Sequence, residues 1–388
     1  MPATPSPCTF IASQRRLDTL LDALRPCPAI AVDTESNSLY AYHERVCLIQ
    51  FSTPDEDFLV DTLAGLDLSP LGEVFANPAQ QKVFHAAEQD IAGLKRDFGF
   101  HFANLFDTMW AARILGWPRV GLGDLLWEHF GVHTDKRYQR YDWGERPLRP
   151  EALAYACLDT HHLLALQEIQ RKGLERTGRT EEAAEVFALL TQTPPAHSPF
   201  GPEAFWRVKG VHDLNGTEQA VLWEVYCWRD RVAQEQDRPP FKVLSNTALL
   251  ALARSRPHST AGLMTIRGIS PYLARRYGAS LLAAIAQGEK ESPPEPPPCS
   301  SRPREAVMAR HHALRAWRAQ VAARRGVDTD VVISNATLWA LAERAPQSLE
   351  EMEGIEGFGP WKRRTYGPDI LRVLHGRRAA GGSPHRKR

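Results

Sequence analysis

Residues 29–35 read Ala-Ile-Ala-Val-Asp-Thr-Glu, a short apolar run that ends in two acidic residues. Such a run is typical of a buried β-strand. Because side chains alternate along a strand, Asp33 and Glu35 share one face. Two carboxylates on one buried face repel each other unless a cation lies between them. The stretch therefore predicts a strand that presents a metal platform. The alternative is that the strand has already ended and both acids are solvated.

Four further apolar runs in the first 110 residues predict more strands, at residues 46–51, 58–61, 82–85 and 105–108. Short polar connections between the first three strands favour antiparallel neighbours. The last two strands alternate with helical patterns at residues 87–98 and 109–115. Strands followed by strand–helix alternation predict an α/β fold, in which helices flank a mixed sheet.

Two later clusters add acidic residues to the first. Asp90 stands early in the helix predicted after residue 87, and Tyr155 and Asp159 belong to a helix predicted from residue 150 to about residue 172. Residues i and i+4 share a helix face, so Tyr155 and Asp159 are neighbours. Taken alone, each acid is an ordinary helix residue, and the helix dipole accounts for Asp90. Together they supply the oxygen ligands that hard divalent cations prefer in two-metal phosphodiester hydrolases.

Length and composition predict a soluble globular protein of two or three domains. The chain has 388 residues, of which 43% are hydrophobic and 24% are charged. No apolar stretch approaches the roughly 18 residues that span a bilayer, and the first ten residues do not resemble a secretory signal. The six cysteines include no C-x-x-C pair. Their spacing predicts neither a zinc site nor a disulfide framework, so the reducing cytoplasm is the expected location.

Charge is divided unevenly along the chain. Residues 1–200 contain 18 basic and 27 acidic residues, whereas the remainder contains 29 and 19. An acidic front half suits a metal centre, and a basic rear half suits a polyanion such as a nucleic acid. Alternatively, part of the rear excess is a solvated tail, because five of its basic residues follow Gly376.

The rear half contains two copies of one module. An offset of 89 residues aligns Trp228 with Trp317 and Gly268 with Gly357 in an ungapped match. Each copy is a helical unit of about 75 residues, within the range that folds alone. Proline-rich linkers are predicted at residues 192–204 and 292–303. The predicted divisions are a front domain with the acidic clusters at residues 1–195, modules at 212–290 and 305–376, a linker at 291–304 and a basic tail at 377–388.

In combination, the acidic motifs resemble the DEDD exonuclease superfamily, in its tyrosine-bearing branch. The surrounding sequence is similar to bacterial ribonuclease D at residues 31–35, 47–50, 82–87, 105–108, 135–136, 142–143, 146–148 and 155–156. The rear modules resemble the HRDC domain (helicase and RNase D C-terminal), in the two-copy arrangement of that family. Two positions depart from the family pattern, since Ser36 replaces an aromatic residue and Tyr141 replaces a small hydroxyl residue.

The resemblance implies a ribonuclease H-like fold and hydrolysis of RNA from its 3′ end, with release of nucleoside 5′-monophosphates. It implies two divalent metal ions as cofactors, Mg²⁺ or Mn²⁺. Asp33 would bridge the two ions, and Glu35 and Asp159 would complete the site of the attacking water. Asp90 would help to hold the second ion. Tyr155 would orient the water by hydrogen bonding, because its unperturbed pKa of about 10 makes it a poor base.

The expected partner is RNA, as transfer RNA precursors or other small structured RNA, acted on by a monomer without membrane attachment. Two other functions remain open, a DNA 3′–5′ exonuclease with the same carboxylates and a non-catalytic RNA-binding scaffold. His85 is a candidate substrate contact or an ordinary core histidine, and Lys136 and Arg140 are candidate phosphate contacts or parts of a solvated loop.

The glycine turns at Gly268 and Gly357 precede helices in the two modules. Their backbone N–H groups are candidates to bind phosphate, or the turns are plain helix boundaries. Trp228 and Trp317 are expected in the core of their modules.

Overall fold

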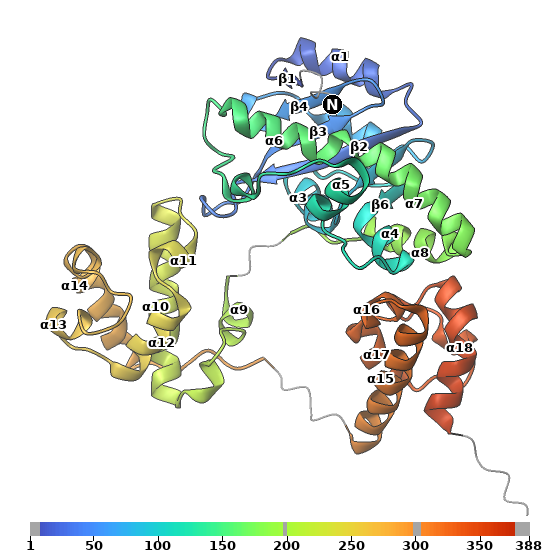
Figure 1. Cartoon of the computed structure of the whole chain (residues 1–388). Coiled ribbons are helices and arrows are strands. Elements are labelled where there is room, and N and C mark those ends of the chain that lie inside the picture. Colours follow the sequence, from blue (N-terminus) through green and yellow to red (C-terminus); the bar gives the residue numbers. More distant parts are fainter. Residues whose placement is uncertain (1–7, 197–199, 298–303, 377–388) are drawn as a thin grey trace, which may run out of the picture.

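The structure is a computed structural model that describes residues 8–196, 200–297 and 304–376 (Figure 1). A six-stranded mixed sheet forms the front part of the chain, with strand order β1-β4-β3-β2-β5-β6. Its strands are β1 (Thr9–Ile11), β2 (Ala29–Ser36), β3 (Val46–Ser52), β4 (Asp57–Asp61), β5 (Gln81–Phe84) and β6 (Leu105–Asp107). β3 pairs antiparallel with β2 and β4, and the other pairs are parallel. The predicted mixed α/β sheet is confirmed.

Strand β2 lies in the interior of the sheet, between β3 and β5. Its first half is fully buried at Ile30 and Val32. The strand continues to Ser36, and Asp33 and Glu35 pair with Gln50 and Leu48 of β3. The alternative in which the strand ends before the acids is therefore wrong.

Helices cover both faces of the sheet, as Figure 1 shows. They are α1 (Gln14–Leu24), α2 (Ser69–Ala76), α3 (Glu88–Phe98), α4 (Thr108–Leu115), α5 (Leu122–Phe130), α6 (Pro150–His161), α7 (Leu163–Thr177) and α8 (Thr180–Leu190). Helix α6 packs on β2, β3 and β4, which places it across the middle of the sheet. This position brings its residues next to the second half of β2.

Three local predictions differ from the structure. The single helix expected from residue 150 to about 172 is two helices, α6 and α7, which meet at His162. The ring of His162 stacks on Phe130, with ring centroids 4.9 Å apart, and no glycine or proline marks the break. Strand β1 was not predicted, because three residues carry too little periodicity. His85 lies just beyond the end of β5 rather than within it.

A disulfide joins Cys8 to Cys157, with their Cα atoms 6.3 Å apart. The bond ties the start of β1 to the middle of α6. The prediction of no disulfide framework is wrong for this pair, because the two cysteines are 149 residues apart and only the fold brings them together. Cys27, Cys47 and Cys227 are free among the described cysteines.

Four α-helices recur in the two rear modules at the predicted offset. The first contains α10 (Gly216–Glu235), α11 (Pro240–Val243), α12 (Asn246–Ser255), α13 (Thr260–Leu263) and α14 (Pro271–Gly288). The second contains α15 (Glu305–Arg325), α16 (Thr329–Val332), α17 (Asn335–Arg344) and α18 (Pro360–His375). The fifth helix of the first module, α13, corresponds to the short 3₁₀ helix η4 (Glu350–Met352) in the second. Trp228 and Trp317 are buried, as expected. Arg229 and Arg318 donate equivalent hydrogen bonds, to the carbonyls of Leu244 at 3.0 Å and Ile333 at 2.8 Å.

The predicted linkers are only partly described. Within residues 192–204, a short helix, α9 (Pro202–Trp206), begins, so this linker is shorter than predicted. Residues 292–297 form no helix or strand, as expected of a linker. The rest of that linker, at residues 298–303, and the predicted basic tail at 377–388 lie outside the described residues.

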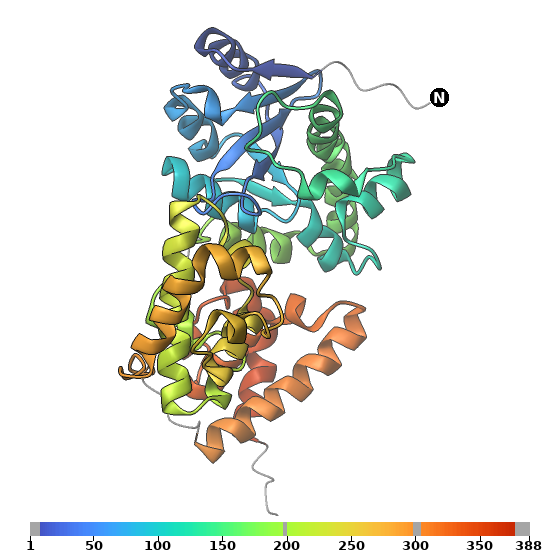
Figure 2. The same cartoon turned by 90° about the vertical axis from the view of Figure 1, so that its left-hand side faces the viewer.

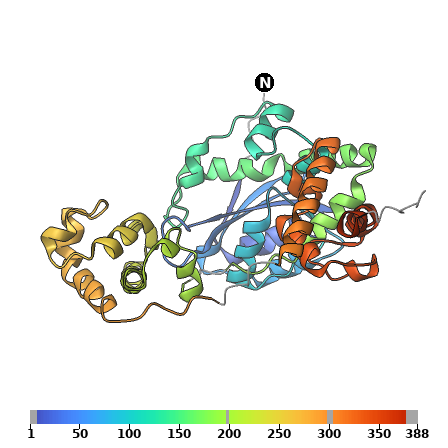
Figure 3. The ribbon, with the colours of Figure 1, turned by 90° about the horizontal axis from the view of Figure 1, so that it is seen from below.

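The two modules attach to the sheet domain in different ways. The view from below shows them at separate places (Figure 3), whereas in Figure 2 the first module lies in front of the second. The second module contributes Val331 to the main hydrophobic core of the sheet domain. Arg325 of that module forms an ion pair of 2.6 Å with the buried Glu182 of α8. The first module attaches through polar contacts, in which the Tyr42 hydroxyl donates to Asp230 at 2.9 Å and Asp237 accepts from the Tyr42 backbone at 3.0 Å.

Replacing Cys8 with serine should lower the free energy of unfolding by about 2–4 kcal/mol without reductant, because the bond restricts the unfolded chain over a long loop. Urea titrations with and without dithiothreitol measure this effect. With reductant, wild type and variant should unfold together, and Cys157→Ala serves as a second variant. Equal stability of wild type and both variants without reductant would contradict the bond.

Candidate active site

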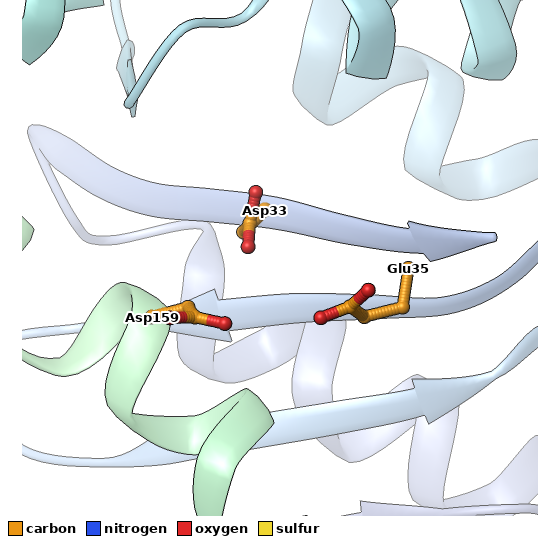
Figure 4. A group of neighbouring side chains, drawn as sticks. All are labelled: Asp33, Glu35 and Asp159. Atoms are coloured by element: carbon orange, nitrogen blue, oxygen red, sulfur yellow. The ribbon is translucent and has the colours of Figure 1, made fainter. Parts of the chain in front are cut away.

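Three of the predicted carboxylates converge beside β2. Asp33 and Glu35 project from the same face of β2, and Asp159 faces them from α6 (Figure 4). One ligand oxygen of each carboxylate lies within 4.8 Å of those of the other two. The three side chains line a cavity of about 430 Å³, together with Tyr155. The alternation along β2 and the packing of α6 across it account for this convergence.

Asp90 lies next to this group without joining it. It stands in the first turn of α3, and its Oδ1 atom accepts a hydrogen bond of 2.5 Å from the hydroxyl of Thr34. Thr34 lies between Asp33 and Glu35 on β2, so one strand carries two of the acidic side chains and hydrogen-bonds a third. The role of Thr34 was not predicted from the sequence. Its position between Asp33 and Glu35 is the sequence signal for that role.

Burial raises the pKa values of all four carboxyls, and repulsion from neighbouring carboxylates adds to the effect. Burial is the larger cause for Asp33, followed by the charges of Asp90, Asp159 and Glu35, and its pKa lies well above the usual range. The pKa of Glu35 is also raised well above its usual value, by burial and then by Asp159 and Asp90. Burial raises the pKa of Asp90 and of Asp159 to about 7. The folded protein therefore holds negative charge here only at an energetic cost.

The ligand set fits hard divalent cations. A buried cluster of carboxylates that raise one another's pKa values is stabilised when a cation replaces the bound protons. The cluster offers only carboxylate oxygens and no histidine nitrogen or thiolate. This composition suits Mg²⁺ or Mn²⁺, and it lacks the nitrogen and sulfur ligands typical of zinc.

Tyr155 lies one helical turn before Asp159 on α6 and lines the same cavity. Burial, and then the negative charge of Asp159, raise the pKa of the Tyr155 hydroxyl above its usual value of about 10. The hydroxyl is therefore neutral at pH 7 and acts as a hydrogen-bond donor rather than as a base.

Of the weaker candidates, His85 and Lys136 line the cavity. His85 is half-buried, its Nδ1 atom lies 2.9 Å from the Thr108 hydroxyl, and burial lowers its pKa to about 4, so the ring is neutral at pH 7. Arg140 is exposed and not part of the cavity wall, and its carbonyl accepts a hydrogen bond from the Tyr40 hydroxyl. Gln139 lines the cavity and was not predicted.

Comparison with known proteins agrees with this fold. Residues 8–175 match the family described as 3′-5′ exonuclease, and residues 218–285 and 308–374 match the HRDC domain. The sheet domain and its two modules thus define a 3′–5′ exonuclease with two HRDC domains.

None of the helices in the described part of the chain combines the length and the hydropathy that a membrane-spanning segment requires.

Similar proteins identify the family within this class. Ribonuclease D of Gluconacetobacter diazotrophicus is 32% identical over 97% of this chain and 95% of its own length. Ribonuclease D of Acidiphilium cryptum is 34% identical, also over 97% of this chain and 95% of its own. The crystal structure of Escherichia coli RNase D matches 95% of this chain and 99% of its own, with a TM-score of 0.70 and 25% identity. The chain therefore belongs to the ribonuclease D family and is a 3′–5′ exoribonuclease.

Without metal, stability should fall as pH rises from about 5 to about 8. The buried carboxyls have raised folded pKa values, so the folded protein binds protons that the unfolded chain has released, and this proton-linked stability disappears as pH passes those values. Added Mn²⁺ should therefore raise the melting temperature more at pH 8 than at pH 5, as thermal unfolding in chelator and in metal measures. Asp33→Asn should reduce both the loss of stability with rising pH and the extra metal-induced rise in melting temperature at pH 8. An identical metal-induced shift at both pH values would contradict this linkage.

Proposed function

We propose that the chain removes nucleotides from the 3′ end of RNA by two-metal-ion catalysis and releases nucleoside 5′-monophosphates. The observation that carries this proposal is the convergence of Asp33, Glu35 and Asp159 within 4.8 Å, in a cavity that Tyr155 also lines. A buried acidic cluster without a cation would cost stability, and a scaffold that only binds RNA has no need of it.

In the proposed reaction, Asp33, Glu35 and Asp159 hold the metal ions, and Asp90 contributes from beside Thr34. When bound, the ions lower the pKa of the attacking water and stabilise the leaving 3′ oxygen. Tyr155 donates a hydrogen bond that orients this water beside Asp159. His85 accepts a hydrogen bond from the substrate, and Lys136 and Arg140 contact its phosphates.

The proposed substrates are transfer RNA precursors and other small structured RNAs. The E. coli relative is described as an exoribonuclease involved in structured RNA processing. The basic rear half supports a polyanion partner. We also propose that the enzyme acts as a cytoplasmic monomer, with an exonuclease domain at residues 1–195, HRDC domains at 212–290 and 305–376 joined by the linker 291–304, and a tail at 377–388.

Asp33→Asn should lower kcat by at least about 10²-fold, because it removes a charge placed to hold the metal ions. RNA binding should remain, since the other contacts are unchanged. The measurement is release of 5′-monophosphates from 3′-labelled RNA and from matched DNA, with Mg²⁺ and with chelator. Normal turnover by the variant would exclude the two-metal assignment, and faster cleavage of DNA would favour a DNA exonuclease.

Tyr155→Phe should lower kcat by about 10- to 100-fold, the usual effect of losing a group that orients an active-site ligand. KM should change little, because the hydroxyl acts on the water rather than on the RNA. Tyr138→Phe is the matched control, since Tyr138 lies near Tyr155, with ring centroids 5.7 Å apart, outside the cavity wall. Equal loss in both variants would indicate a general packing effect.

A further inference from the structure

An exposed aromatic pair lies on α5 and the loop that follows it. The rings of Trp127 and His133 stack with centroids 4.0 Å apart and an interplanar angle of 25°. Trp127 is nevertheless 49% exposed, and it is the one exposed tryptophan among the residues that the structure describes. His133 covers part of the indole, and about half of the Trp127 surface stays exposed. A tryptophan in this arrangement gains little from burial.

This pair lies on the same helix and loop that line the catalytic cavity. The first turn of α5 forms part of the cavity wall, through Gly123 and its neighbours. Trp127 follows Gly123 by four residues, so it lies on the same helix face, about 6 Å further along the axis. Thr134, next to His133, also lines the cavity, and a Cβ atom at Gly123 would lie 2.7 Å from its hydroxyl. Helix and loop therefore continue together from the cavity wall to the aromatic pair.

The surroundings of the pair are suited to a nucleic acid strand. Lys136 lies in the cavity wall and forms no ion pair with any described residue. Its neighbour Arg137, in contrast, forms an ion pair of 2.6 Å with Asp135. An unpaired cation in the cavity wall and an exposed aromatic ring on the same helix and loop match the alternation of phosphates and bases along a single strand.

We propose that the Trp127–His133 pair is a stacking platform for a base of the RNA strand upstream of the 3′-terminal nucleotide. This inference rests on the proposed function, since it places the terminal nucleotide in the cavity. Stacking on an aromatic ring requires no particular base, because every base has a π-face. The platform therefore holds single-stranded 3′ ends without sequence preference and directs them toward Asp33, Glu35 and Asp159.

The test is Trp127→Ala assayed on single-stranded RNA. Loss of one stacking contact should raise KM by about 5- to 150-fold and leave kcat at saturating RNA unchanged. Trp127→Phe should restore most of the affinity, because phenylalanine keeps an aromatic face. Leu189→Ala is the control, since Leu189 is similarly exposed on α8 and lies away from this cavity. An unchanged KM for Trp127→Ala would overturn the proposal.

Two further measurements separate stacking from folding and from chemistry. RNA with abasic nucleotides upstream of its 3′ end should have the same KM for wild type and Trp127→Ala, and a remaining difference would overturn the stacking role. The affinity for intact RNA is also compared between Asp33→Asn and the double variant Asp33→Asn/Trp127→Ala, because Asp33→Asn is expected to bind RNA without hydrolysing it. Equal affinities there would overturn the platform, whereas absence of metal-dependent hydrolysis by wild type would overturn only the proposed reaction.

Discussion

Repulsion among buried carboxylates at the end of β2 is the constraint on which the active site depends. The charges of Asp90 and Asp159 raise the pKa values of both Asp33 and Glu35, and Glu35 also raises the pKa of Asp33. The cost of this repulsion must be met by the rest of the domain until a cation neutralises it. The buried apolar half of β2 and its pairing with β3 and β5 provide a rigid support for these charges.

Helix α6 is held against the sheet by polar contacts as well as by the disulfide. Ser52 Oγ lies 2.5 Å from Asp57 Oδ1 and 2.7 Å from the hydroxyl of Thr160, and His161 Nδ1 lies 2.7 Å from Asp57 Oδ2. These contacts flank Asp159 directly on its C-terminal side. The side chains that hold α6 to β3 and β4 therefore also fix the position of its last turn, whereas sequence periodicity alone continues into α7.

The parts of the site that follow from short-range periodicity could be predicted from the sequence. Asp33 and Glu35 are two residues apart on a strand, and Tyr155 and Asp159 are four apart on a helix, so local geometry decides which pairs share a face. Contacts between distant elements could not be predicted in the same way. The hydrogen bond from Thr34 to Asp90 and the disulfide from Cys8 to Cys157 depend on how the sheet and helices pack.

The two HRDC domains show how one sequence pattern acquires different roles through its neighbours. In the second domain, Glu185 of the exonuclease domain occupies the start of the helix that follows Gly357. Its carboxylate accepts a hydrogen bond of 2.5 Å from the backbone N–H of Trp361. A phosphate at this position would have to displace that carboxylate. In the first, Ser270 caps the equivalent helix by accepting from Leu273, and the phosphate role of the Gly268 turn stays a prediction. Since Val331 also joins the core of the exonuclease domain, the second HRDC domain is a structural extension of that domain, whereas the first is held by the polar contacts of Tyr42.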